Sequence, residues 1–159
     1  LVPPKFALML EGLDDPRTQL VELTLEHPTA ILHSTPPHPT EVTLARLRPD
    51  AEGKVELLVN NSIRNVLVTP ASGYTVRVSS DRYLTREVTG VALSAGAEIS
   101  IPTLLAGDLN SDNEVNSVDG SILHGQWGRS FGVADINRDR KVNSIDWGYI
   151  RKNFLTFGD

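Results

Sequence analysis

Two stretches of the chain carry Asp and Asn residues at the same spacing, 27 residues apart. Counted from the first aspartate of each stretch, positions 1, 3, 5, 9 and 12 all bear a carboxylate or amide oxygen. These positions hold Asp108, Asn110, Asp112, Asn116 and Asp119 in the first copy, and Asp135, Asn137, Asp139, Asn143 and Asp146 in the second. Calcium prefers six to eight oxygen ligands, and a twelve-residue EF-hand-type loop supplies them at this spacing. The repeat therefore predicts two calcium sites.

The duplication is more informative than either loop alone. A single loop rich in Asp and Asn is often only an Asx-turn, whereas two copies in register favour paired metal sites. Position 7 would contribute its backbone carbonyl oxygen, which comes from Glu114 in one copy and Lys141 in the other. Position 8 is Val115 or Val142. We expect these two valines to form a short β-bridge between the loops.

Each loop also departs from the EF-hand pattern. Position 6 normally carries glycine, but here it is Asn113 or Arg140, and an arginine in a left-handed turn is strained. Residues 99–103, before the first loop, are typical of a strand and a linker, and residues 125–132, before the second, are too rich in glycine for a helix. We therefore expect no helix to enter either loop. After each loop, apolar residues four and five positions apart predict a short helix. These residues are Val118, Ile122 and Leu123 in the first copy and Ile145, Tyr149 and Ile150 in the second.

Residues 107–157 resemble a dockerin, the calcium-binding module that attaches secreted enzymes to cohesin domains. The resemblance rests on Gly107–Asp119 and Asp135–Asp146, with asparagine and serine at positions 9 and 10, aspartate at 12 and no entering helix. It implies two bound calcium ions and, as partner, a cohesin domain of a scaffold or cell-surface protein. It also implies cohesin contacts at positions 10 and 11 and about one and a half turns beyond each loop. These positions are Ser117, Val118, His124 and Gly125 in copy one, and Ser144, Ile145, Arg151 and Lys152 in copy two.

The first hundred residues follow a different pattern, with short apolar runs separated by turn residues. Several runs alternate between apolar and polar residues, which is typical of half-buried strands. The expected strands are Phe6–Leu10, Leu20–Glu26, Glu41–Leu47, Val55–Val59, Tyr74–Val78, Glu87–Leu93 and Glu98–Ile101. Seven short strands favour a small all-β, Ig-like sandwich. We therefore expect two domains, an all-β sandwich over residues 1–102 and a small α dockerin fold with two calcium loops over residues 103–159.

The sandwich segment also carries a weaker family resemblance. Residues 73–78, 83–85 and 88–91 are similar to the Ig-like modules found beside dockerins, which include X modules and carboxypeptidase-regulatory-like domains. This resemblance is one of strand composition. It implies that the sandwich braces the dockerin and widens its interface.

Composition excludes several functions. The chain has 159 residues, a net charge of -5 and no cysteine, so it has no disulfide, thiol chemistry or cysteine-bound metal. An acidic balance argues against nucleic-acid binding, and no apolar run approaches the ~18 residues that span a membrane. His33 and His38 flank a proline-rich loop, where exposed histidines are more common than a metal site. Because the chain starts at Leu1 rather than methionine, we interpret it as a fragment or mature segment.

These observations predict a non-enzymatic, secreted adaptor that binds a cohesin and does not insert into a membrane. No nucleophile, phosphate-binding or zinc-protease motif is present. The alternative is an accessory carbohydrate-binding or structural region of a secreted glycoside hydrolase. A third possibility is a calcium-stabilised repeat with no partner. Within the adaptor interpretation, we expect loop one to bind calcium more tightly and the second helix to dominate the cohesin contact.

Overall fold

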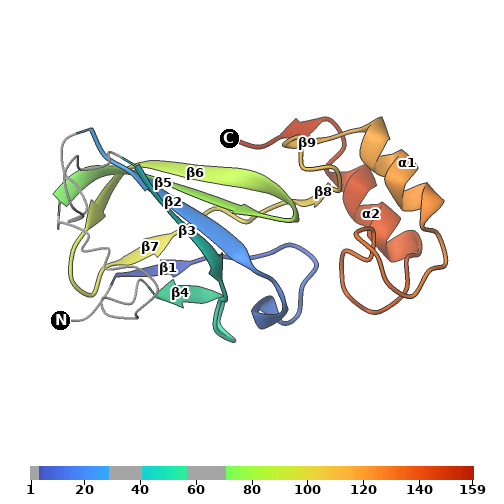
Figure 1. Ribbon diagram of the computed structural model, residues 1–159, viewed down its shortest axis with the longest axis horizontal. Coiled ribbons are helices and arrows are strands. Elements are labelled where there is room, and N and C mark those ends of the chain that lie inside the picture. The colour runs from blue at the N-terminus through green and yellow to red at the C-terminus, as the bar shows by residue number, and fades with distance from the viewer. Residues whose placement is uncertain (1–3, 29–40, 57–70) are drawn as a thin grey trace.

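The computed structural model of the chain describes residues 4–28, 41–56 and 71–159. Its N-terminal part contains β1 (Lys5–Ala7), the 3-10 helix η1 (Pro16–Thr18), β2 (Val21–Glu26), β3 (Glu41–Leu47), β4 (Lys54–Glu56), β5 (Ala71–Ser80), β6 (Arg82–Leu93) and β7 (Glu98–Ser100). Its C-terminal part contains β8 (Ala106–Asp108), β9 (Glu114–Val115), α1 (Ser117–Gly125), α2 (Ser144–Lys152) and β10 (Thr156–Phe157). Figure 1 shows most strands at one end of the molecule and both helices at the other.

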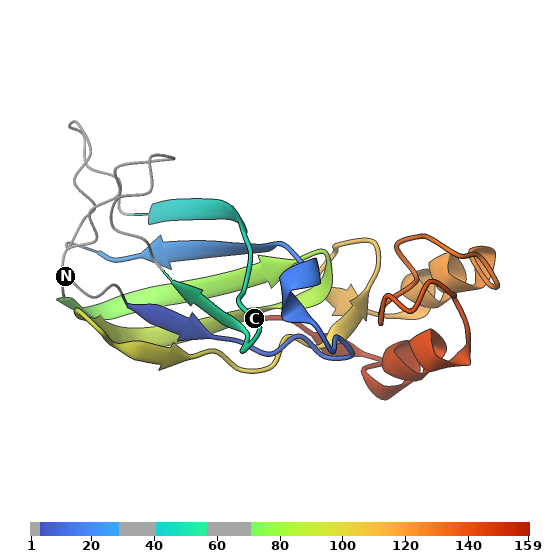
Figure 2. The ribbon, with the colours of Figure 1, turned by 90° about the horizontal axis from the view of Figure 1, so that it is seen from below.

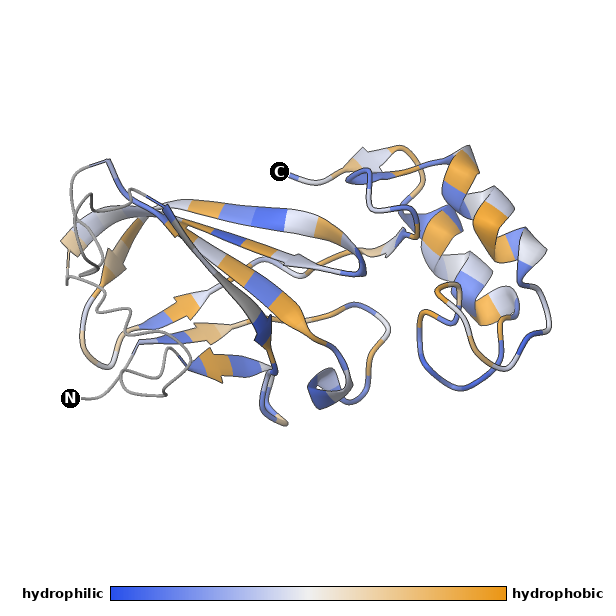
Figure 3. Cartoon of the chain, in the orientation of Figure 1, coloured by the Kyte–Doolittle hydropathy of each residue, from blue (hydrophilic) through white to orange (hydrophobic). Residues whose placement is uncertain are grey.

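The N-terminal strands form two layers, as Figure 2 shows from below. The larger sheet has the antiparallel order β3-β2-β5-β6-β8, and the smaller has the order β4-β1-β7 with β1 parallel to β7. Alternate residues of β2 and β5 are buried, which produces the striped hydropathy of these strands in Figure 3. Leu23 and Val76 of the larger sheet belong to one core with Phe6 and Val55 of the smaller. The β-sandwich prediction is confirmed.

The seven expected strands all coincide with observed ones; Glu41–Leu47 has the expected ends, and the other six differ at one or both ends. β5 and β6 are longer than expected because they form one twisted hairpin around Asp81. The expected continuation of β4 to Val59 lies outside the described residues, as do the proline-rich loop and His33 and His38. The strands β8, β9 and β10 were not among the predicted ones.

Both predicted helices are present and both begin with the same cap. The side chain of Asn116 accepts a hydrogen bond from Val118 N, and the side chain of Asp119 accepts one from Asn116 N. Asn143 and Asp146 form the same capping box at the start of α2. A capping box satisfies backbone donors that a helix start would otherwise leave unpaired. Positions 9 and 12 of each loop therefore also fix where the following helix begins.

The two helices run in opposite directions, and this arrangement separates the two loops. In Figure 1, α1 leads away from β9 whereas α2 leads back toward β8, so the loops lie at opposite ends of the helix pair. The expected bridge between Val115 and Val142 is therefore wrong. Val115 pairs with Thr156 of β10, and Val142 exchanges backbone hydrogen bonds with Gly128 and Arg129.

The helical part is joined to the sandwich by a shared sheet edge. β8 pairs with the start of β6, with Arg82 opposite Asp108 and Tyr83 opposite Ala106. Asp108, the first aspartate of loop one, is thus the last residue of a strand in the larger sheet. The sandwich therefore sets the position of loop one directly.

Glu11 forms a second connection between the two parts. Its side chain is only 9% exposed and accepts hydrogen bonds from Ala106 N (3.0 Å) and Asn153 Nδ2 (2.6 Å), and it forms an ion pair with Lys152. Asn153 in turn donates to the Ala106 carbonyl oxygen at 2.8 Å. Burial alone raises the pKa of Glu11, but the hydrogen bonds from Lys152, Asn153 and Ala106 outweigh it and lower the pKa below its ordinary value. Glu11 thus ties the end of α2 to the sandwich as a carboxylate.

The C-terminal residues form a third connection. Asp159 N donates to the Thr85 carbonyl oxygen at 3.1 Å, and Glu87 N donates to Asp159 Oδ2 at 3.0 Å. Asn113, at position 6 of loop one, accepts from Thr85 N at 2.8 Å through its side-chain oxygen. The turn of loop one is therefore hydrogen-bonded to β6.

We predict that Glu11→Ala lowers the free energy of unfolding by about 1–3 kcal/mol, because it leaves buried donors of Ala106 and Asn153 without an acceptor. The pKa of Glu11 is lower in the folded than in the unfolded protein. The contribution of its ionised form to the free energy of unfolding is therefore fully present above the ordinary pKa of 4.5, and it is lost as the pH falls through the lower pKa of the folded state. Urea unfolding at pH 7 and at decreasing pH measures both effects. Lys152→Ala is the matched control and should change little, because Lys152 is largely exposed. A difference between wild type and Glu11→Ala that grows on acidification would contradict this account.

Candidate functional site

The first and last aspartates of loop one are buried and fixed by backbone donors. Asp108 is 3% exposed, and its two oxygens accept from Asp112 N (3.2 Å) and Asn113 N (2.9 Å). Asp119 is fully buried and accepts from Leu109 N (2.7 Å) and Asn116 N (2.8 Å). Oδ1 of Asp119 also accepts from Asn110 N at 3.3 Å, so both of its lone-pair sites are used, whereas Oδ2 accepts from Asn116 N alone. The loop thus fixes both carboxylates and leaves acceptor capacity on Asp119 Oδ2.

Loop two repeats this geometry. Asp135 is 5% exposed and accepts from Arg140 N at 3.0 Å through Oδ2. Asp146 is fully buried and accepts from Ile136 N (2.8 Å) and Asn143 N (2.9 Å). In both loops Asx-type bonds fix the middle positions, where the side chains at 3 and 5 accept from backbone N–H groups two residues on. The sequence repeat is therefore a structural repeat.

Both loops turn through left-handed backbone conformations. Position 6 has a φ of 66° at Asn113 and 70° at Arg140. Arg140 therefore has the left-handed conformation in which strain was expected. This conformation costs a residue with a Cβ about 1–2 kcal/mol, which is why glycine is usual at position 6. Position 4 is also left-handed, with φ of 63° at Ser111 and 60° at Arg138, although neither residue type indicates this conformation.

The loops carry buried negative charge that fits a divalent cation. Oδ1 of Asp135 is buried and has no hydrogen-bond partner. Burial raises the pKa of both Asp108 and Asp135, and the neighbouring Asp119 and Asp146 respectively add to this effect. A bound cation would supply the positive charge that is needed to compensate these buried carboxylates. The residues present therefore fit a metal ion in each loop.

The chemistry of the donors indicates which kind of metal fits. In the part of the chain that the structure describes, no three His, Cys, Asp or Glu side chains form a ready-made metal cluster. The ligand set would therefore need the Asn amides and the position-7 carbonyl oxygens of Glu114 and Lys141 as well. An all-oxygen set of carboxylates, amides and carbonyls suits a hard cation such as calcium rather than zinc.

The predicted partner-contacting residues lie mostly on exposed parts of the two helices. Val118 and Ile145, at equivalent positions, are 49% and 52% exposed. Ser117, His124, Gly125, Ser144 and Arg151 are also exposed. Lys152 differs from these, because its ammonium group is paired with Glu11 of the sandwich.

One residue of the helix face breaks the symmetry of the repeat. Trp147 is 40% exposed and lies against Gly120, its equivalent in the first copy, where an added Cβ would be 3.2 Å from Trp147 Cζ3. The Trp147 ring of α2 therefore packs against α1 at Gly120. The pairing of a small and a large residue was visible in the sequence, but their contact follows from the antiparallel packing of the helices.

Comparisons with known proteins agree with this geometry. Residues 106–156 match the family model of the dockerin type I domain, a family that generally binds calcium. No curated protein matches the chain. Two crystal structures of type II cohesin–X-dockerin complexes from Acetivibrio cellulolyticus each contain a similar chain.

The first complex is an N-terminal interface mutant and gives a TM-score of 0.67 at 19% identity, with 99% of this chain and 98% of that chain covered. The second is a C-terminal interface mutant and gives a TM-score of 0.69 at 19% identity, with the same coverage. At this identity the likeness establishes a shared fold. That fold extends over the sandwich as well as the helical part.

We predict that calcium removal unfolds the helical part and leaves the sandwich folded. About 54 residues with few large apolar side chains commonly need a metal to stay folded. Trp127 and Trp147 are the only tryptophans and both lie in this part, so their fluorescence reports on it selectively. Addition of EGTA should change tryptophan fluorescence and helical circular dichroism, while the strand signal persists. If both tryptophan and helix signals ignore EGTA, the metal assignment is wrong.

We further predict that loop one binds calcium more tightly than loop two. Residues 108–119 hold four acidic and no basic side chains, whereas residues 135–146 hold three of each. Each charge ~8 Å from the ion is worth roughly 1 kcal/mol at a dielectric near 80, and strain at Arg140 acts in the same direction. Calorimetry should show at least about tenfold tighter binding in Asp135→Ala, which keeps loop one, than in Asp108→Ala. The reverse order would refute the ranking.

Proposed function

We propose that this chain, whose residues 106–156 form a dockerin type I domain, binds a cohesin domain in a calcium-dependent manner and does not catalyse a reaction. The observation that carries the proposal is the paired loop-and-cap geometry. In each copy, the oxygens at positions 9 and 12 that would hold calcium also cap the helix that presents Val118 or Ile145. Metal binding would therefore order the same helix starts that contact the partner.

The proposed division of the chain follows the change in architecture. Residues 1–102 would form an X-module-like sandwich and residues 103–159 the dockerin. Supporting this division, the described strands up to β7 belong to the two layers, and the residues from β8 onward include both loops and both helices. Because β8 completes the larger sheet, the dockerin would be held in a fixed orientation on the sandwich.

Each loop would hold one calcium ion, giving two ions in all. The proposed ligands of the first are Asp108, Asn110, Asp112, Asn116 and Asp119 with the Glu114 carbonyl oxygen. Those of the second are Asp135, Asn137, Asp139, Asn143 and Asp146 with the Lys141 carbonyl oxygen. The support for this assignment is the unpartnered, buried Oδ1 of Asp135 and the backbone hydrogen bonds that the first and last aspartates of the two loops share.

The proposed setting is extracellular. Dockerin modules belong to secreted components of cellulosomes, which degrade polysaccharides. Among the described residues, no helix has the length and apolarity needed to cross a bilayer. The chain would therefore anchor a secreted protein to a cohesin-bearing scaffold or to the cell surface.

Within the proposed cohesin face, α2 would contribute more than α1. The end of α2 is fixed by Glu11, so its exposed Ile145 and Arg151 are presented by a rigid element, which lowers the ordering cost of binding. Trp147 also extends from α2 across Gly120 and covers part of α1. The first copy offers no aromatic side chain at the equivalent position.

Two matched pairs of variants test this proposal. Ile145→Asp and Arg151→Gln should each weaken cohesin binding by about tenfold or more, because a charge or a lost contact at the centre of an interface is costly. Val118→Asp and His124→Gln, at the equivalent positions of copy one, should weaken it less. Surface plasmon resonance against immobilised type I and type II cohesins, with calcium or EGTA, measures these effects. Equal losses from the two pairs would contradict the preference for α2.

A polysaccharide gel-shift assay distinguishes the proposal from the alternative accessory role. Retardation by a polysaccharide, with no binding to any cohesin in calcium, would favour the carbohydrate-binding interpretation. Calcium-dependent cohesin binding without retardation supports the adaptor.

A further inference from the structure

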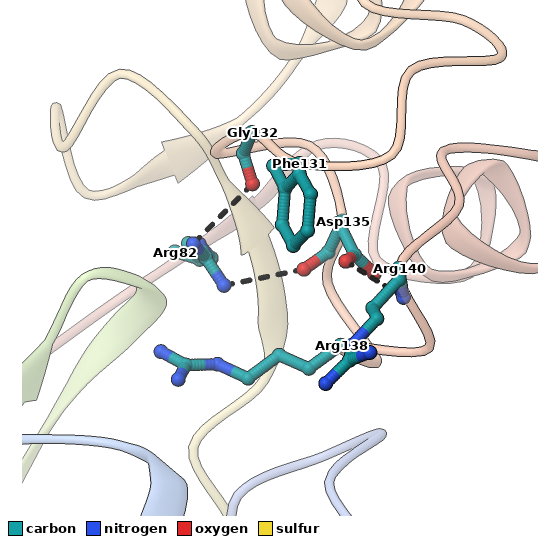
Figure 4. Close-up of a pocket in the computed structure, with 6 residues that line it drawn as sticks. All are labelled: Arg82, Phe131, Gly132, Asp135, Arg138 and Arg140. Carbon is teal, nitrogen blue, oxygen red and sulfur yellow. Dashed lines mark hydrogen bonds between the residues drawn. The ribbon is translucent and has the colours of Figure 1, made fainter.

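A pocket of about 410 Å³ lies where loop two meets the sandwich. It is lined by Arg82 from the start of β6 and by Phe131, Gly132, Asp135, Arg138 and Arg140 from the segment that contains loop two (Figure 4). Three arginines thus line one pocket in a protein whose net charge is -5. This concentration of guanidinium groups has no role in holding calcium and requires a separate explanation.

Arg82 is held in the wall of the pocket by weak, neutral partners. Its two terminal nitrogens donate to the backbone carbonyl oxygens of Asp135 (3.2 Å) and Gly132 (3.3 Å), as the dashed lines in Figure 4 show. Its Nε is buried and has no hydrogen-bond partner. A buried N–H of a charged group without an acceptor is costly. The pocket wall therefore contains a guanidinium group for which the described part of the chain provides acceptors to only two of five N–H groups.

The other two arginines do not have a carboxylate partner either. Arg138 extends to the sandwich, where it donates to the Thr18 carbonyl oxygen and the Gln19 side-chain oxygen, both of which are uncharged. The Arg140 guanidinium makes no hydrogen bond or ion pair with any described residue and is exposed. Asp135 is the one carboxylate in the lining, and it belongs to the proposed calcium site. Asp135 and the neighbouring Asp81 act electrostatically on Arg82, but three arginines line the pocket against one lining carboxylate, so the lining keeps an excess of positive charge.

Phe131 adds an apolar surface to this cationic pocket. Its side chain is 75% exposed, and Figure 4 shows its ring next to Arg82 and Asp135. A ring at the edge of a cationic pocket can pack against the face of a sugar or another ring while guanidinium groups pair with an acidic group. The lining therefore matches an organic acid better than a bare inorganic ion.

We infer that this pocket binds a carboxylate-bearing ligand, for which a sugar acid has the matching combination of an anionic group and a ring face. The carboxylate would accept hydrogen bonds from the N–H groups that the Arg82 terminal nitrogens do not give to Asp135 and Gly132, and from Arg140. Arginine binds carboxylates well because its planar fork matches their geometry. The inference does not depend on cohesin binding and uses the proposed function only in that loop two is folded around its ion.

The test is a titration of the calcium-loaded chain with sodium D-glucuronate, with D-glucose as the neutral control and with acetate and sulfate as small anions. Calcium loading is measured first by calorimetry, so a failure of the metal assignment is seen separately. We expect glucuronate to bind more tightly than acetate and glucose not to bind. In ¹⁵N NMR spectra, the Arg82 Nε–H signal should shift on binding, whereas the signal of Arg129, outside the pocket, should not.

Matched variants locate the site. Arg140→Gln should weaken glucuronate binding by about tenfold, because it removes a charged donor that holds no other part of the structure. Arg129→Gln removes an exposed arginine of the same segment and should leave the affinity unchanged. Phe131→Ala should reduce the preference for glucuronate over acetate. The inference is overturned if glucuronate does not bind, if only sulfate binds, or if Arg140→Gln and Arg129→Gln behave alike.

Discussion

The C-terminal part of this protein depends on four buried aspartates, Asp108, Asp119, Asp135 and Asp146. Their oxygens accept backbone hydrogen bonds that shape each loop, and the second of each pair also caps the following helix. Buried carboxylates are expensive unless a cation compensates them. The same four residues therefore determine the loop shape, the start of each helix and the need for a metal. We therefore expect a bound cation to stabilise the helix face.

The sandwich acts on this arrangement at both ends. β8 and Asn113 link loop one to β6, while Arg82 and Arg138 link loop two to the sandwich. Glu11 fixes the end of α2 between them. These links explain why the two parts have one orientation although their sequences have different patterns.

Local patterns predicted the parts that local physics decides. Period-two alternation located the strands, the oxygen spacing located both loops and the apolar spacing located both helices, because these signals are complete within a few residues. The connections were not predictable in this way. Glu11 and Asn153 are 142 residues apart in the chain, and no local pattern pairs them. The expected bridge between Val115 and Val142 was wrong because it assumed adjacent loops, whereas the antiparallel helices place them at opposite ends.

The most direct test of the central claim compares two calcium titrations of the same chain. One follows helix formation by circular dichroism, and the other follows cohesin affinity by surface plasmon resonance at each free calcium concentration. If calcium builds the helix face that binds the cohesin, the helical signal and the cohesin affinity should rise over the same calcium range, and subsequent addition of EGTA should reverse both changes. Full cohesin affinity at a calcium concentration where α1 and α2 are not formed would contradict the account.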